Sequence, residues 1–208
     1  MLSYKDSLNV LKKTKALLEG HFVLTSGLHS NRYVQCAKLL SDPNAASKIC
    51  SSLAEKIFKS FPSVDLILSP ALGGIIIGYE MGRRLNKETI FSERVKGKFQ
   101  LRRGFSIKKD TKVLIVEDVI TTGKSILECA KLVKKANAII LGFACIIDRS
   151  NKKNLLIKKN KIVSQIKISI PVYKKKNLPS FLKKIPATKQ GSRFLKYKWL
   201  DWVSILII

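Results

Sequence analysis

The sequence predicts an α/β fold in which a central parallel sheet is flanked by helices. Three short, largely apolar runs at residues 64–68, 113–116 and 138–147 have the composition of strands buried on both faces, which is typical of parallel sheets. Helical sequence over 75–85 and 125–135 follows the first two runs, and strands that alternate with helices indicate a parallel sheet.

The chain of 208 residues is expected to form a single domain over 1–208, because a chain of this length buries a substantial core. Its hydrophobic content of 46% excludes the class of disordered proteins. The N-terminal sequence shows no apolar signal-peptide core and no run of membrane-spanning length. The cysteines are widely separated and form no CxxC pair, so we expect buried free thiols in a cytoplasmic protein and no zinc site: Cys36, Cys50, Cys129 and Cys145.

The charge is strongly positive, with 40 Lys and Arg against 14 Asp and Glu and a formal net charge of +26. Such a field attracts phosphates, nucleic acids and acidic lipids. The lysines are spread along the whole chain and do not gather in one stretch. This distribution indicates a compositional bias, so we expect neither a specific nucleic-acid partner nor a membrane partner.

The N-terminal region predicts a helix followed by a hairpin. Leucines alternate with lysines over residues 4–19, which is typical of an amphipathic helix, and Gly20 is a plausible stop. His21 is then expected at the helix end. Residues 22–35 predict two short strands around a polar turn with Gly27 at the bend.

The middle of the chain predicts one anion-binding turn and one basic segment. Asp42 and Pro43 favour a helix start before 45–59. Residues 69–74 end in two glycines that open a helix, which favours an anion, and a helix start packed closely on a strand is the alternative. Residues 89–92 predict an edge strand. The basic stretch 93–105, with its two glycines, is either a solvated hairpin or a mobile lid.

The most informative segment begins with the apolar run at 113–116. Glu117 and Asp118 follow where this strand ends, and ligands of open α/β sheets bind at that edge. Residues 121–125 form a turn of hydroxyl residues around Gly123 that opens a helix, so its amides favour a phosphate. Two carboxylates beside a phosphate require ribose hydroxyls or Mg²⁺ to relieve their repulsion. An ordinary βα turn with solvated acids is the alternative, whereas a Walker A motif fails on spacing.

This segment resembles the phosphoribosyl-diphosphate (PRPP) motif of type I phosphoribosyltransferases. In that motif a strand is followed by two acids, two apolar residues and the sequence Thr-Thr-Gly-x-Ser. The resemblance implies the type I phosphoribosyltransferase fold, a Rossmann-like parallel sheet with a small hood subdomain. It also implies that the two acids hold the ribose hydroxyls and that the turn holds the 5′-phosphate. The implied PRPP-binding residues are Leu72, Gly73, Gly74, Arg94, Glu117, Asp118, Val119, Ile120, Thr121, Thr122, Gly123, Lys124 and Ser125.

A second motif narrows the resemblance. Residues 22–33 follow the pattern F-x-L-x-S-G-x-x-S-x-x-Y, which is similar to the hood hairpin of the orotate-specific phosphoribosyltransferases. The resemblance covers about residues 5–193, with the hood from 1–40 and 160–193 and the core from 41–150. Arg149 follows the strand 138–147, and it is either a clamp for the orotate carboxylate or half of a surface pair with Asp148. The implied orotate-binding residues are Ser26, Gly27, Thr121 and Arg149.

The basic stretch departs from the family pattern, because it contains no histidine. In relatives it closes over PRPP, often in the neighbouring subunit, and its cations stabilise the leaving diphosphate. Gly73 stands near the place where long relatives carry a lysine, which removes one cationic contact. Arg94 is our choice for a diphosphate ligand, and surface charge alone remains the alternative for each catalytic candidate: Lys96, Lys98, Arg102 and Arg103.

The resemblance implies Mg²⁺-dependent transfer of ribose 5-phosphate from PRPP to orotate in a homodimer with a shared active-site loop. Mg²⁺ would bind mainly through the diphosphate, with Asp118 as the candidate protein ligand. Two rival hypotheses remain open: transfer to another base, or a module that binds PRPP or RNA without turnover.

The C-terminal third predicts less. Residues 151–161 form a lysine–asparagine run that is expected to be a solvated turn, and 162–170 alternate in strand fashion. Residues 185–193 resemble the usual end of the short orotate enzymes. The tail 194–208 lies outside the pattern and is too short to span a membrane.

Overall fold

The computed structural model describes residues 1–24, 26–151, 155–157 and 162–189. The chain divides into two compact units. The first, which we call the core unit, comprises Met1–Leu17 and Val34–Ser169, and the second, the hairpin unit, comprises Leu18–Tyr33 and Ile170–Ile208. The predicted boundaries of hood and core stay a prediction.

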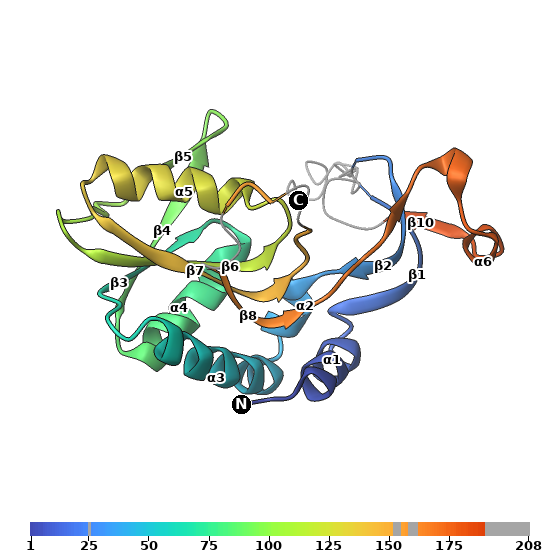
Figure 1. Cartoon of the computed structure of the whole chain (residues 1–208), viewed down its shortest axis with the longest axis horizontal. Coiled ribbons are helices and arrows are strands. Elements are labelled where there is room, and N and C mark those ends of the chain that lie inside the picture. Colours follow the sequence, from blue (N-terminus) through green and yellow to red (C-terminus); the bar gives the residue numbers. More distant parts are fainter. Residues whose placement is uncertain (25, 152–154, 158–161, 190–208) are drawn as a thin grey trace, which may run out of the picture. The chain divides into compact units, whose positions relative to one another are not determined.

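The core unit is built on a six-stranded sheet with the strand order β5-β4-β3-β6-β7-β8 (Figure 1). Neighbouring strands run parallel except at β4 and β5, which are antiparallel. This confirms the predicted α/β class with a largely parallel sheet. The strands are β3 Leu66–Pro70, β4 Glu88–Val95, β5 Lys98–Leu101, β6 Lys112–Ile120, β7 Ile139–Asp148 and β8 Ile162–Lys167.

Helices cover both faces of this sheet (Figure 1). On one face, α5 (Lys124–Lys135) buries Ile126, Cys129 and Val133 against apolar side chains of the strands. On the other face lie α3 (Pro43–Ser60) and α4 (Gly73–Leu85). The remaining helices of the core unit are α1 (Tyr4–Lys13) and α2 (Cys36–Leu40).

Glycines let α4 lie unusually close to its strands. A Cβ atom at Gly78 would lie 2.1 Å from Ser69 Oγ, and one at Gly82 would lie 1.9 Å from Thr89 Oγ1. No real side chain tolerates such distances, so both positions require glycine for packing. These contacts hold the middle of α4 against β3 and its last turn against β4.

The expected first helix is too long. Helix α1 ends at Lys13, and β1 (Leu17–Val23) begins three residues after the C-cap Thr14. The helix ends after Thr14, whose amide and hydroxyl still donate to the Val10 carbonyl, because Lys15 adopts a left-handed φ of 56°. Gly20 and His21 therefore lie inside a strand, and neither marks a helix end.

The neighbouring signals are confirmed. Asp42 accepts hydrogen bonds from the Asn44 and Ala45 amides and caps α3, as its sequence predicts. The expected hairpin also forms, with Gly27 in its turn at a φ of 76°.

The predicted edge strand at 89–92 is wrong in its placement. This segment forms the first half of β4, which lies between β3 and β5, and β5 is the edge strand. Residues 93–101 continue the pairing as a hairpin, whose two-residue turn places Lys96 and Gly97 at φ values of 46° and 80°. The hairpin alternative therefore describes this part of the basic stretch.

The hairpin unit contains a four-stranded sheet with the order β10-β1-β2-β9. In it, β1 pairs in parallel with β10 and β2 pairs antiparallel with β9. Its other elements are β2 (His29–Val34), β9 (Val172–Tyr173), the short helices η2 (Lys175–Asn177) and α6 (Ser180–Lys183), and β10 (Ala187–Lys189).

Several predictions concern residues outside this description. Most of the lysine–asparagine run lies there, at 152–154 and 158–161, as do 190–193 of the predicted C-terminal motif and the whole tail 194–208. Within the ranges that are described, none of the helices combines the length and the apolar composition that crossing a membrane requires.

Candidate active site

The candidate site lies at the carboxyl edge of the core sheet, where β3, β6 and β7 end. The strand register places Ile115 of β6 beside Leu68 of β3 and Phe143 of β7. The residues that follow these positions therefore leave the sheet at the same edge. This arrangement brings together the 71–74 loop, the Glu117–Asp118 pair and Arg149, as the sequence predicts.

The acid pair sits in an environment that opposes two negative charges. Burial raises the pKa of Glu117 to about 8, the charge of Asp118 adds to this rise, and a hydrogen bond with Ser125 opposes it. Burial also raises the pKa of Asp118, while the Val119 amide, 2.8 Å from Asp118 Oδ1, counteracts the rise. The pair is therefore poised to take up a hydroxyl donor or a cation.

The 71–74 loop approaches the acid pair closely. A Cβ atom at Gly73 would lie 3.0 Å from both carboxylate oxygens of Asp118. The Ala71–Leu72 peptide is cis, and the Ala71 amide donates to the Ser92 carbonyl at 2.8 Å. Glycine at this position thus leaves room between the loop and the carboxylate.

The 121–125 turn opens α5. Gly123 occupies the N-cap at a φ of 78°, and no side chain of the described residues caps the helix. Thr122 Oγ1 lies 3.4 Å from the Lys124 amide, at the limit of a hydrogen bond. The first amides of α5 are therefore available to an anion at the positive end of the helix dipole.

The side chains around this turn differ in access. Thr121, Thr122 and Lys124 are exposed, and Ser125 is partly buried. Ile120 is fully buried in the apolar cluster of the sheet, and its carbonyl accepts a 2.8 Å hydrogen bond from the Arg149 amide. A ligand contact by Ile120 would have to come from its backbone.

The turn after β7 is fixed by a buried carboxylate. Asp148 is 4% exposed, accepts the Ser150 amide at 2.8 Å and pairs with Lys167 at 3.0 Å. Asp148 is thus engaged in the interior, which contradicts the alternative of an Asp148–Arg149 surface pair. The backbone at Arg149 is held on both sides of the residue.

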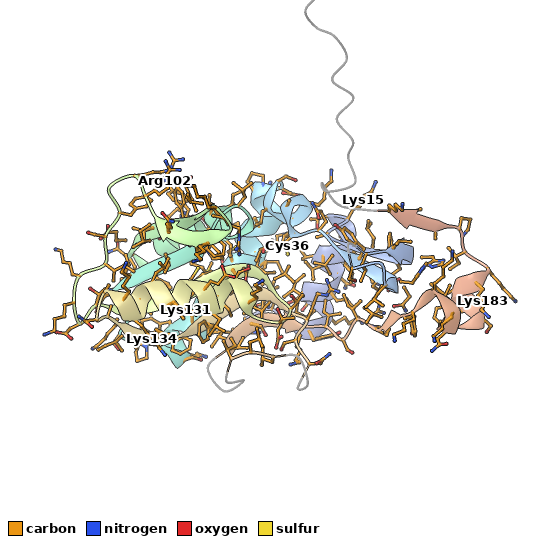
Figure 2. The ribbon with its side chains drawn as sticks, turned by 90° about the horizontal axis from the view of Figure 1, so that it is seen from above. Lys15, Cys36, Arg102, Lys131, Lys134 and Lys183 are labelled. Atoms are coloured by element: carbon orange, nitrogen blue, oxygen red, sulfur yellow. The ribbon has the colours of Figure 1, made fainter. Side chains whose placement is uncertain are left out.

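The basic candidates of the hairpin fall into two groups. Arg94 forms a 3.0 Å ion pair with Glu128 of α5, and Arg103 makes two 3.0 Å hydrogen bonds to Glu93. All five candidates are exposed, and the other three differ in place: Lys96 occupies the tight turn and Lys98 lies on β5. Arg102 lies just beyond β5 (Figure 2). Ser26 and Gly27 belong to the turn of the hairpin unit.

Two partners were missed by sequence reasoning: Glu128 beside Arg94 and Lys167 beside Asp148. The first pair joins β4 to α5, and the second joins register partners on the neighbouring strands β7 and β8. One signal for the first pair was available in the sequence. Glu128 is the single acidic residue of the otherwise basic helix α5, and it lies one turn after the helix start, next to the buried Cys129.

The described residues contain no group of three or more His, Cys, Asp or Glu side chains arranged to hold a metal. All four cysteines are free and buried, as predicted. At the candidate site, the carboxylates that could contact a metal ion are those of Glu117 and Asp118.

The raised pKa of Glu117 predicts a pH-dependent cost to stability. Between its ordinary pKa of 4.5 and about 8, the unfolded chain releases a proton that the folded chain keeps, so stability falls as pH rises through this window. Glu117→Gln removes the effect while keeping the shape. The variant should melt at a higher temperature than the parent at pH 8, by roughly 2–4 °C for each kcal/mol relieved, and at nearly the same temperature at pH 5. Melting curves that differ equally at both pH values would contradict the burial of this carboxylate.

Comparison with known proteins matches residues 38–175 to the phosphoribosyl transferase domain. The chain is 45% identical, over 188 residues, to an orotate phosphoribosyltransferase from Chlorobium phaeobacteroides, which covers 90% of this chain and 95% of the relative.

The fold is similar to solved structures of the same kind. The orotate phosphoribosyltransferase of Aeropyrum pernix superposes with a TM-score of 0.65 and 25% identity over 77% of this chain and 92% of that one. An adenine phosphoribosyltransferase from Thermoanaerobacter pseudethanolicus shares the fold, with a TM-score of 0.57 and 20% identity over 66% of this chain and 88% of that one. The chain belongs to the phosphoribosyltransferase family and, within it, to the orotate phosphoribosyltransferases.

Proposed function

We propose that this protein transfers the ribose 5-phosphate group of PRPP to orotate, giving orotidine 5′-monophosphate and diphosphate in pyrimidine synthesis. The observation that carries the proposal is the acid pair at the end of β6, followed directly by the phosphate-binding turn and flanked by Arg149 of the neighbouring strand. The curated relative with 45% identity carries the same activity in its name.

The ribose 5-phosphate moiety is assigned to β6 and α5. Glu117 and Asp118 accept hydrogen bonds from the ribose hydroxyls, which satisfy buried carboxylates at low electrostatic cost. The amides of α5 bind the 5′-phosphate at the positive helix end, and the turn adds its hydroxyls. The residues of this subsite are Glu117, Asp118, Val119, Ile120, Thr121, Thr122, Gly123, Lys124 and Ser125.

The diphosphate is assigned to the loop of Leu72, Gly73 and Gly74 and to Arg94. The glycines allow the anion to approach the backbone, and Arg94 extends from β4 beyond Ser92, whose carbonyl holds the Ala71 amide. As the bond to the leaving group breaks, negative charge grows on the diphosphate. Fixed cations at that place stabilise the transition state more than the bound substrate.

The donor set fits Mg²⁺ held mainly by the substrate. Mg²⁺ commonly takes one or two carboxylates and completes its shell with phosphate oxygens and water, and the acid pair offers such carboxylates. Asp118 is the proposed protein ligand. When bound, the ion neutralises charge on the diphosphate.

Orotate is assigned to Arg149, Thr121, Ser26 and Gly27. A guanidinium accepts a carboxylate in a two-pronged hydrogen bond, and the Asp148 turn fixes the backbone from which Arg149 projects. Because orotate is already an anion, the reaction does not demand a dedicated general base.

The remaining cations are proposed to act on the leaving group from the hairpin. Lys96, Lys98 and Arg102 are exposed, whereas Arg103 must release Glu93 before it contacts a ligand. Closure of this segment would exclude water and strengthen the attraction between cation and diphosphate.

A direct assay tests the proposal. Purified protein mixed with PRPP, Mg²⁺ and orotate should lower the ultraviolet absorbance of orotate, and omission of any one component should abolish the change. Asp118→Asn keeps the shape of the side chain and should reduce turnover by about 100-fold or more, with a melting temperature no lower than that of the parent as evidence of folding. Turnover with another base, or binding of PRPP or RNA without turnover, would reject the assignment.

The orotate clamp has its own test. Arg149→Ala should raise the KM for orotate by at least about tenfold, and the KM for PRPP should change much less, because the lost contact is to the carboxylate alone. Lys134→Ala, which removes an exposed charge on α5 (Figure 2), is the control. Equal increases in both KM values would argue against the clamp.

We further propose a cytoplasmic homodimer. Its four free and buried thiols suit a reducing compartment, which cell fractionation would check. For the dimer contact, α4 and the residue before it expose Leu72, Ile76 and Tyr79, at 85%, 54% and 68%, along one helix face.

The dimer proposal predicts that a charge on this face separates the subunits. Tyr79→Glu should convert a species of twice the chain mass into a monomer, as measured by light scattering during size-exclusion chromatography. Phe58→Glu, which charges another exposed aromatic position (65%) on α3, should leave the mass unchanged. A monomeric parent, or a dimer that survives Tyr79→Glu, would exclude this face.

A further inference from the structure

The side chain of Arg94 is held by three groups of the core unit. Its Nη1 lies 3.0 Å from Glu128 Oε2 and donates to the Gly97 carbonyl at 2.5 Å, and its Cζ lies 4.2 Å above the ring of Phe99. The two polar contacts use the same nitrogen, and the aromatic contact is made by the guanidinium carbon. Within the described residues, no hydrogen bond engages the Nε–Nη2 edge of Arg94.

The contact with Glu128 is one of two adjacent contacts between β4 and α5. Ser92 Oγ lies 3.2 Å from Cys129 Sγ, and the Arg94–Glu128 ion pair continues the same line of contact toward the carboxyl end of β4. Helix α5 carries the phosphate-binding turn at its start, and the Ser92 carbonyl holds the diphosphate loop through Ala71. Glu128 therefore joins the two parts of the proposed PRPP site.

The pairing of Glu128 is selective. The helix offers a lysine at i+3, Lys131, which lies exposed on α5 (Figure 2). The carboxylate of Glu128 instead pairs with Arg94 of the hairpin, with side-chain exposures of 22% for Glu128 and 40% for Arg94. Arg94 is exposed and Glu128 is partly buried, so solvent screens the charge of Glu128 less than that of a fully exposed carboxylate.

We propose that Glu128 is a positioning residue for the diphosphate-binding arginine: it fixes Arg94 through Nη1 and leaves the Nε–Nη2 edge for the diphosphate of PRPP. This inference rests on the proposed function, in which Arg94 contacts the diphosphate. A guanidinium held at one nitrogen and stacked on a ring loses little conformational freedom when an anion binds its other edge. Glu128 itself contacts neither substrate nor reacting atoms.

The test is a double-mutant cycle with inorganic diphosphate and Mg²⁺ as the probe, measured by titration calorimetry. Glu128→Gln keeps the shape of the side chain and removes its charge. It should weaken diphosphate binding by about tenfold, and Arg94→Ala should weaken it at least as much. In the Arg94→Ala background, Glu128→Gln should have no further effect, because Glu128 acts through Arg94.

The control is Glu80→Gln. Glu80 pairs with Arg84 on α4, and its side chain is 18% exposed, close to the 22% of Glu128. Glu80 also pairs with Arg83 at 2.8 Å, so its substitution removes two ion pairs from α4 and should still leave diphosphate affinity unchanged. Steady-state kinetics should show a raised KM for PRPP and an unchanged KM for orotate in Glu128→Gln, which a general loss of stability would not produce.

Three results would overturn the inference. Tighter diphosphate binding in Glu128→Gln would make Glu128 a competitor of the diphosphate. The other two are a loss of diphosphate affinity in Glu128→Gln that is equal with and without Arg94, and an Arg94→Ala variant that loses no diphosphate affinity. Each is independent of whether orotate is the acceptor. If the cycle gives the expected coupling but orotate is not consumed, the positioning role stands and the base assignment fails.

Discussion

The site depends on the repulsion between two adjacent carboxylates at a partly buried sheet edge. Glu117 and Asp118 follow four fully buried strand residues, so they leave the interior without reaching full solvation. The protein tolerates this by keeping Glu117 largely protonated near neutral pH and by giving Asp118 one backbone donor. In the proposed function, ribose hydroxyls and a magnesium-bound diphosphate would supply the remaining donors and positive charge.

The same edge concentrates much of the scarce negative charge of the chain. The sequence has 14 acidic residues against 40 basic ones, and carboxylates at this edge and on the adjoining hairpin hold cations in place. Glu93 pairs with Arg103, Glu128 with Arg94 and Asp148 with Lys167. In a strongly basic protein, the position of each carboxylate thus decides which basic side chain is held in an ion pair and which remains available to an anion.

Local chemistry made much of the fold and site predictable. The buried run before Glu117, the glycine turn at 121–125 and the Asp42 cap each carry their signal within a few residues, and the structure has all three. The end of α1 was not predictable in this way, because Leu17 and Leu18 suit a helical stripe as well as a strand. Pairing of β1 with its neighbours in the hairpin unit decides the matter. The Arg94–Glu128 and Asp148–Lys167 pairs were equally hidden, since they depend on how a helix or strand lies across another.

We infer that ribose hydroxyls and a cation replace the proton on Glu117 when PRPP binds. Calorimetric titration of PRPP with Mg²⁺ at pH 7, in buffers of different ionisation enthalpy, measures the protons released. With the pKa of Glu117 at about 8, binding should release about one proton, and Glu117→Gln should lose that release. Binding with no difference in proton release between the parent and Glu117→Gln would contradict the assignment of the ribose to the acid pair.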